Sequence, residues 1–138
     1  MIFYSFLLNN LCNFTKKSMN IILPGDKDYE PRPSVQRKSL RINLNENIYG
    51  TFVEIGAGQE VARNFYRVGA ASGTIAKSMS AYDKSFSDSI YGKEDNGRYV
   101  TQNRLDKMLN HEMDLLEKRI SRDKNPDKFF FVYANTVA

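Results

Sequence analysis

The segment that most constrains the fold is TFVEIGAGQEVARNFYRVG, residues 51–69. Its first five residues are mostly apolar or β-branched, as in a buried strand. Gly56 and Gly58 follow, and from residue 59 apolar side chains recur every three or four positions, as on one face of a helix. Gly69 then stands where a left-handed residue commonly ends a helix. This strand, turn and helix predict a Rossmann-like start to an α/β domain, or else an α+β domain.

The remaining elements follow from periodicity and turn signals. SLRINLN at 39–45 alternates polar and apolar residues, which predicts a half-buried strand. Residues 70–83 are rich in Ala, Ser and Gly, and residues 84–99 are polar, so we expect a packing seam and then a loop. An apolar stripe predicts a long helix over 101–122 with Thr101 as its N-cap, and the aromatic run at 128–134 predicts a buried strand.

We expect three regions along the chain. Residues 1–18 are predicted to be a non-native or disordered extension before Met19, residues 19–38 an extended leader, and residues 39–138 the N-terminal part of an α/β domain. The last strand has no following helix, so the sheet is expected to be incomplete and the chain to be a fragment lacking its C-terminal part. MIFYSFLL lacks the features of a signal peptide and is too short to span a bilayer, which predicts a cytoplasmic protein without a membrane partner.

Composition excludes several classes of function. The chain is 41% hydrophobic and 26% charged, as in an ordinary globular protein, and its formal charge of +4 is spread along the sequence. We therefore expect no nucleic-acid partner, because proteins that bind DNA or RNA gather Lys and Arg on one surface. Cys12 and His111 are the only cysteine and the only histidine. Disulfides, cysteine zinc sites and Ser-His-Asp or Cys-His catalysis within the chain are thereby excluded, and we predict no metal ligands of this kind.

The glycine turn allows two interpretations. Glycines between a strand and a helix let backbone N–H groups approach a phosphate, and the helix dipole favours the anion. Gly56 and Gly58 are placed for this role, but Val61 stands where the dinucleotide fingerprint has its third glycine, and Glu60 would repel a phosphate. The turn is therefore either part of a nucleotide site or a tight turn that binds nothing.

Polar residues after the predicted helix complete the candidate site. Ser72, Thr74 and Lys77 can form a loose phosphate-binding group, although the spacing is not that of a P-loop. Asp83 is the candidate catalytic base or metal residue, and nearby Asp88 makes a Mg²⁺ ion conceivable if a nucleotide is bound. A small-residue packing seam and solvated loop charges explain the same residues without any ligand.

The stretch from Tyr29 to Ala138, centred on GTFVEIGAGQEVARNFYRVGAASGTIAKSMSAYD, resembles the N-terminal part of a family of uncharacterised bacterial proteins. Members of that family carry two conflicting names, nicotinate-nucleotide adenylyltransferase and TonB-dependent receptor. The resemblance implies a longer full-length protein and supplies no catalytic residue for this chain. The H-x-G-H site of ordinary nucleotidylyltransferases is absent, because His111 is alone, and MIFYSFLL lacks the features expected of a receptor's export signal.

The sequence thus supports two hypotheses. The first is a cytoplasmic α/β domain, nucleotidyltransferase-like if it is an enzyme, that binds a nucleotide or phosphometabolite through Gly56, Gly58, Ser72, Thr74 and Lys77, with Asp83 as catalytic residue. The second is a non-catalytic scaffold or protein-interaction domain whose glycines only shape a turn. Whether the protein is an enzyme, and which cofactor it uses, is left open by the residues.

Overall fold

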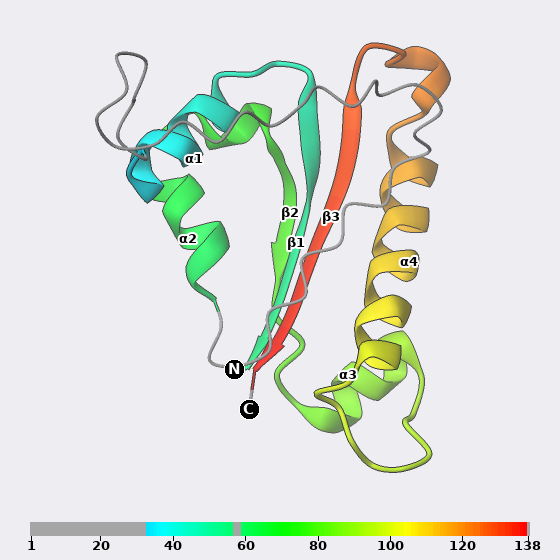
Figure 1. Cartoon of the computed structure of the whole chain (residues 1–138). Coiled ribbons are helices and arrows are strands. Elements are labelled where there is room, and N and C mark those ends of the chain that lie inside the picture. Colours follow the sequence, from blue (N-terminus) through cyan, green and yellow to red (C-terminus); the bar gives the residue numbers. More distant parts are fainter. Residues whose placement is uncertain (1–32, 57–58, 138) are drawn as a thin grey trace, which may run out of the picture.

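The computed structural model describes residues 33–56 and 59–137, in which helices cover both faces of a parallel sheet (Figure 1). Its strands are β1 (Ile48–Gly56), β2 (Ile75–Met79) and β3 (Phe129–Val137), in the order β2-β1-β3. Its α-helices are α1 (Val35–Asn43), α2 (Glu60–Arg67), α3 (Lys84–Tyr91) and α4 (Gln102–Arg119). Two short 3-10 turns are η1 (Ala71–Gly73) and η2 (Arg122–Lys124). The predicted α/β class is confirmed, and the parallel pairing sets the α+β alternative aside.

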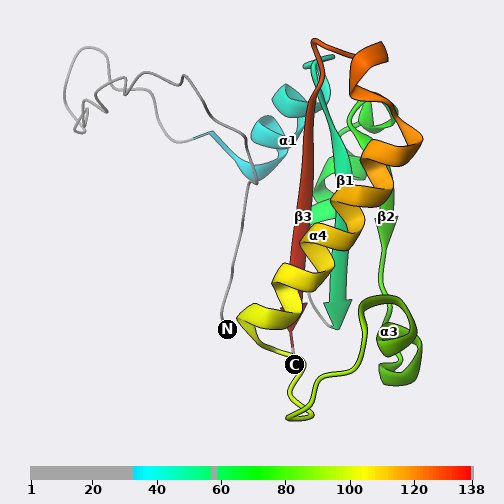
Figure 2. The ribbon, with the colours of Figure 1, turned by 90° about the vertical axis from the view of Figure 1, so that its right-hand side faces the viewer.

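The central strand β1 is buried on both faces, which explains its nearly continuous apolar sequence. Phe52 contacts the α1–α2 side and packs on Phe65 with ring centroids 5.0 Å apart. Val53 lies on the opposite face in a core with Met108 and Leu109 of α4. Figure 2 shows α4 lying across this second face of the sheet. The alternation of successive side chains along one strand therefore supplies both cores.

One part of the predicted order is wrong: residues 39–45 are not a strand. Helix α1 covers residues up to Asn43, and Ser34 caps it by accepting a hydrogen bond from the Arg37 amide at 3.2 Å. Asn43 faces inward and donates through Nδ2 to the carbonyl oxygens of Phe65 at 2.9 Å and Gly69 at 2.7 Å. A polar residue thus occupies a buried helical position because it satisfies carbonyl groups around the end of α2.

Two regular elements lie where irregular structure was expected. The small-residue tract contains β2, and the supposed loop at 84–99 begins with α3. The other elements agree with the sequence to within a few residues: α2 ends before Gly69, which has a φ of 84°, and Thr101 caps α4 by accepting from the Arg104 amide at 3.2 Å. The proposed regions 1–18 and most of 19–38 lie outside the described residues.

The topology defines an edge where a ligand site is expected. The chain moves from β1 to β2 on one side and then crosses back to β3 on the other, which makes a topological switch point between β1 and β3. All three strands are parallel, so their carboxyl ends meet at one edge of the sheet. Among the described residues, no helix combines the length and apolar character needed to cross a membrane.

Candidate functional site

A cavity of about 220 Å³ opens at this edge, on the face covered by α3 and α4. Ile55 and Thr136, which are partners in the β1–β3 register, both line it, so the cavity lies at the switch point. We call it the α3–α4 pocket, and its lining residues are Ile55, Ala81, Tyr82, Lys84, Ser87, Tyr99, Arg104 and Thr136.

Arg104 is the buried cation of this pocket. It lies in the first turn of α4 and is only 1% exposed. One terminal guanidinium nitrogen donates to Ser87 Oγ at 2.7 Å and to Asp88 Oδ1 at 3.4 Å. The other donates to the Gly92 carbonyl oxygen at 2.5 Å and to Glu94 Oε1 at 3.4 Å. Within the part of the chain that the structure describes, its Nε–H has no hydrogen-bond partner. A buried, unpaired donor of this kind is costly unless a ligand or water accepts from it.

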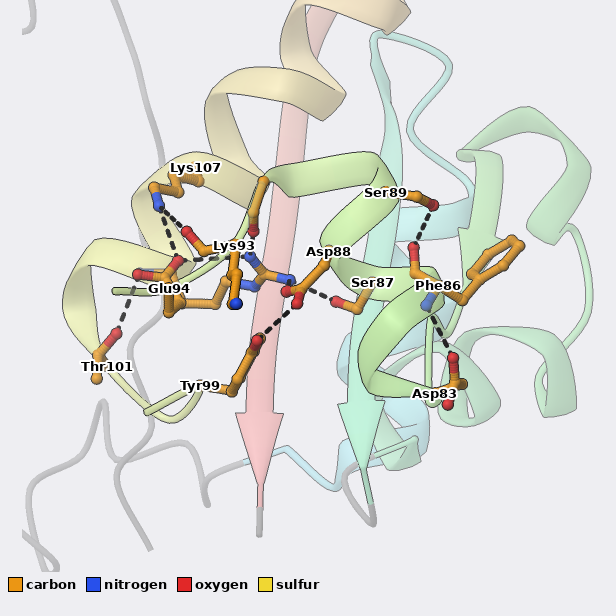
Figure 3. A network of polar contacts seen from close by, with 12 residues as sticks. Asp83, Phe86, Ser87, Asp88, Ser89, Lys93, Glu94, Tyr99, Thr101 and Lys107 are labelled. Atoms are coloured by element: carbon orange, nitrogen blue, oxygen red, sulfur yellow. Dashed lines mark hydrogen bonds and ion pairs between the residues drawn. The ribbon is translucent and has the colours of Figure 1, made fainter. Parts of the chain in front are cut away.

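Tyr99 and Lys84 form the outer wall of the pocket. The ammonium group of Lys84 lies 4.7 Å from the centroid of the Tyr99 ring, and the Arg104 guanidinium lies 5.0 Å from the same centroid. The Tyr99 hydroxyl donates to Asp88 Oδ2 at 2.7 Å (Figure 3). Burial and this hydrogen bond to Asp88 raise the pKa of Tyr99 above its usual value. Tyr99 therefore remains a neutral donor that fixes Asp88 while two cations stay beside its ring.

Glu94 anchors the loop between α3 and α4. Its carboxylate accepts from Lys107 at 2.9 Å and from Asn103 at 2.8 Å, and Figure 3 shows Lys107 turned toward it. Burial alone would raise the pKa of Glu94, but the hydrogen bonds from Lys107 and Asn103 outweigh it and set the pKa below its ordinary range. The loop that carries Tyr99 to the pocket is thus fixed by charge-assisted hydrogen bonds.

Asp83, the predicted catalytic residue, is the N-cap of α3 in the structure. It is exposed and caps α3, because Oδ1 accepts from the Phe86 amide at 2.8 Å (Figure 3). It lies between two lining residues of the α3–α4 pocket, Tyr82 and Lys84, without lining the pocket itself. Among residues 33–56 and 59–137, no three His, Cys, Asp or Glu side chains gather in a metal-binding arrangement.

The turn containing Gly56 leads to α2, and the carboxylate of Glu54 binds the backbone amides at the N-terminus of this helix. Glu54 is 2% exposed, and its two oxygens accept from the amides of Val61 at 3.1 Å and Ala62 at 2.8 Å. Asn135 of β3 also donates to it, at 3.0 Å. The Val61 and Ala62 N–H groups, which a phosphate at the start of α2 would use, are therefore already satisfied by an internal anion. Gly56 has a φ of 84°, and Gly58 lies outside the described residues.

The other predicted phosphate ligands do not converge with this turn. Ser72 and Thr74 lie at the amino end of β2, where the Thr74 carbonyl accepts from the Gly50 amide at 2.8 Å. Lys77 lies in mid-strand on the α4 face and forms an ion pair with Glu112. Because β1 and β2 are parallel, Ser72 and Thr74 are at the opposite end of the sheet from Gly56. The structure thus separates the residues that the sequence interpretation combined.

A second cavity, of about 380 Å³, lies at the same sheet edge on the α2 face. We call it the α2 pocket, and it is lined by Glu54, Gln59, Glu60, Ala62, Arg63, Tyr66, Ser78, Met79 and Ser80. Gln59 Nε2 donates to Ser80 Oγ at 3.2 Å, which joins the start of α2 to the end of β2. This pocket contains two carboxylates and one cation, whereas the α3–α4 pocket contains two cations and no carboxylate.

The sequence interpretation did not identify Arg104 or the buried group around Glu112. Glu112 accepts from the Tyr91 hydroxyl at 2.9 Å, and burial, followed by the negative charge of Glu112, raises the pKa of Tyr91. A signal for both is present in α4: Arg104, Met108 and Glu112 are spaced by four and share a buried face. Charged residues within an apolar helical stripe indicate a buried polar network.

Comparison with known proteins supports the fold and leaves the family open. No protein-family model matches the chain, and no curated protein matches it. The structure is similar to that of the competence/damage inducible protein CihA from Agrobacterium tumefaciens, with a TM-score of 0.50 and 12% identity. The match covers 63% of this chain and 58% of that one. At this identity, the two proteins can be said to share an α/β fold, and that is what the comparison establishes.

Proposed function

We propose that the protein binds a small phosphate-bearing molecule, a nucleotide or phosphometabolite, with the phosphate in the α3–α4 pocket. The observation that carries this proposal is the buried Arg104, whose Nε–H has no hydrogen-bond partner among the described residues and which lines a cavity at the switch point of a parallel sheet. Open α/β sheets bind ligands in the crevice at such points. A phosphate oxygen would supply the acceptor that this Nε–H lacks, while the terminal nitrogens keep their bonds to Gly92, Ser87 and the two carboxylates.

The remaining lining groups suit the same anion. Lys84 adds an accessible positive charge at the outer wall. Ser87 Oγ accepts from Arg104, so its own hydroxyl hydrogen remains available to a ligand, and Thr136 supplies another hydroxyl. The exposed ring of Tyr82 offers an apolar surface for the rest of the ligand. This assigns the phosphate to different residues from those singled out by the sequence.

Electrostatics favours this location over the start of α2. The N-terminus of α2 is neutralised by Glu54, and Glu60 adds a further negative charge there. An anion on that side would approach two carboxylates and one arginine, Arg63. The nucleotidyl transfer suggested by the resemblance, and a cytoplasmic location, both stay predictions.

Isothermal titration calorimetry with inorganic phosphate and AMP tests the proposal. Lys84→Gln should weaken binding of both by roughly threefold to tenfold, the effect of losing one exposed charge-assisted contact. Lys93→Gln makes the same change on an exposed lysine of the neighbouring loop that does not line the pocket, and it should leave affinity unchanged. Equal affinities for the two variants, or no binding by the unmodified protein at millimolar ligand, would contradict the proposal.

A protein-interaction role is the alternative function, and one observation favours it. Helix α1 and its C-cap expose large apolar side chains: Val35 is 51%, Leu40 37% and Leu44 65% exposed. Exposed apolar groups gathered on one element are a feature of interaction surfaces. Concentration-dependent sedimentation of the unmodified protein, lost in Leu44→Ser, would support this role, and it is independent of phosphate binding.

A further inference from the structure

We infer that the ring of Tyr82 stacks on an aromatic base of the ligand, so that the α3–α4 pocket takes a nucleotide in preference to an aliphatic phosphometabolite. This inference rests on the proposed function, because it takes the phosphate to lie beside Arg104 and Lys84. It narrows the class of ligand and assigns Tyr82 as the residue that sets the preference.

Tyr82 presents an open aromatic face inside the pocket. It lines the same cavity as Arg104, and it is 77% exposed, the largest fraction among the large apolar and aromatic side chains of the described residues. Its ring therefore keeps most of its apolar surface in contact with water. A flat aromatic ligand would remove this surface from water and gain the offset stacking that aromatic rings favour.

The backbone on both sides of Tyr82 is fixed. Ala81 is buried in the core that includes Val53 and Leu105. Asp83 caps α3 by accepting from the Phe86 amide at 2.8 Å. Because its backbone is held in this way, the Tyr82 ring moves only about its own two side-chain torsions, and it loses little conformational entropy when a base stacks on it.

The neighbouring aromatic rings are not open to a base in this pocket. Tyr99 also lines the cavity, but Lys84 and Arg104 lie 4.7 Å and 5.0 Å from its ring centroid, and its hydroxyl donates to Asp88. Phe86 is exposed but does not line the cavity, and Figure 3 shows its ring turned away from the residues around Glu94 and Tyr99. Among the described lining residues, Tyr82 is therefore the ring that a base can reach.

The stacking ring and the accessible cation of the pocket lie close together in the chain. Lys84 follows Tyr82 by two residues, which places their Cα atoms at most about 7 Å apart. Both side chains line one cavity, so a phosphate beside Lys84 and a base on Tyr82 can belong to a single molecule joined by a ribose. The lining residues include no carboxylate that would repel the phosphate.

The test compares inorganic phosphate, ribose 5-phosphate and AMP by calorimetry. AMP should bind about tenfold more tightly than ribose 5-phosphate, as expected for one base stacked on an aromatic side chain. Tyr82→Ala should reduce this ratio to below about threefold, whereas Tyr82→Phe keeps the ring and should keep the ratio. Tyr66→Ala, which removes an exposed tyrosine of the α2 pocket, is the matched control and should also keep it.

The outcomes separate this inference from the proposed function. If ribose 5-phosphate and AMP bind equally, or if Tyr82→Ala leaves the ratio unchanged, the inference is overturned while phosphate binding stands. Loss of the ratio in Tyr82→Phe would contradict stacking as its cause. If none of the three probes binds, the proposed function fails and the inference fails with it. The exposed Tyr82 ring makes few packing contacts, so Tyr82→Ala is expected to fold, which circular dichroism checks.

Discussion

Glu54→Gln should be severely destabilising, because Glu54 joins β1, α2 and β3. Its carboxylate accepts from Val61 at 3.1 Å, Ala62 at 2.8 Å and Asn135 at 3.0 Å while being 2% exposed. Glutamine keeps one acceptor oxygen and places an NH₂ group against an N–H donor. The change removes at least one charge-assisted hydrogen bond, worth about 1.5–3 kcal/mol, and the favourable charge at the helix start, worth about 0.3–2 kcal/mol.

The expected loss is about 3–5 kcal/mol of unfolding free energy, since a buried donor is also left unpaired. Urea unfolding followed by far-UV circular dichroism measures it, which suits a chain without tryptophan. Glu60→Gln is the matched control: it makes the same change on an exposed residue in the first turn of α2 and should cost less than about 1 kcal/mol. Equal effects of the two substitutions would refute the assignment of Glu54 as the internal anion of α2.

Three further predictions concern stability. Gly50→Ala should prevent correct pairing of β1 with β3, because the added Cβ would lie 2.2 Å from the Phe131 carbonyl oxygen. Gly73→Ala is the control: its added Cβ would lie 4.0 Å from the nearest atom, the Asn43 carbonyl oxygen, so circular dichroism should show a normally folded protein. Burial raises the pKa of Tyr91, so the stability from its neutral phenol is fully present below a pH of about 10 and is lost as pH rises toward the folded value. Tyr91→Phe should reduce this alkaline loss in melting curves, and a smaller loss should remain because the pKa values of Tyr99 and Tyr133 are raised as well. Asp83→Ala should cost about 1 kcal/mol and Asp83→Asn much less in urea unfolding, while neither alters phosphate binding in calorimetry, because the role is a cap.

The strongly periodic parts of the fold are predictable from the sequence. The strand, turn and helix at 51–69 and the long helix α4 carry local signals, and tertiary contacts agree with those signals. Helix α1 was assigned to a strand because a short alternating run does not reveal that Asn43 satisfies carbonyl groups around the end of α2. Strand β2 was missed because Ala76 and Ser78 have weak strand preference, and pairing with β1 is what makes the segment extended.

The candidate site was less predictable, because it depends on contacts between distant residues. The glycine turn points to the carboxyl edge of the sheet, where the proposed pocket also lies, but no local pattern shows that Glu54 occupies the helix start. Arg104 lines its pocket with Ser87 and Thr136, which lie 17 and 32 positions away in the chain. The expected leader ends before Val35, because residues 35–38 begin α1, and the division of the residues before it into an extension and a leader stays a prediction.

The central claim, that phosphate binds beside Arg104 and not at the start of α2, is tested most directly by nuclear magnetic resonance. A titration of the ¹⁵N-labelled protein with inorganic phosphate should shift the Arg104 Nε–H signal and the backbone amide of Thr136, while the amides of Val61 and Ala62, already bonded to Glu54, stay in place. Shifts confined to Val61 and Ala62, or no shift at either location, would contradict the account.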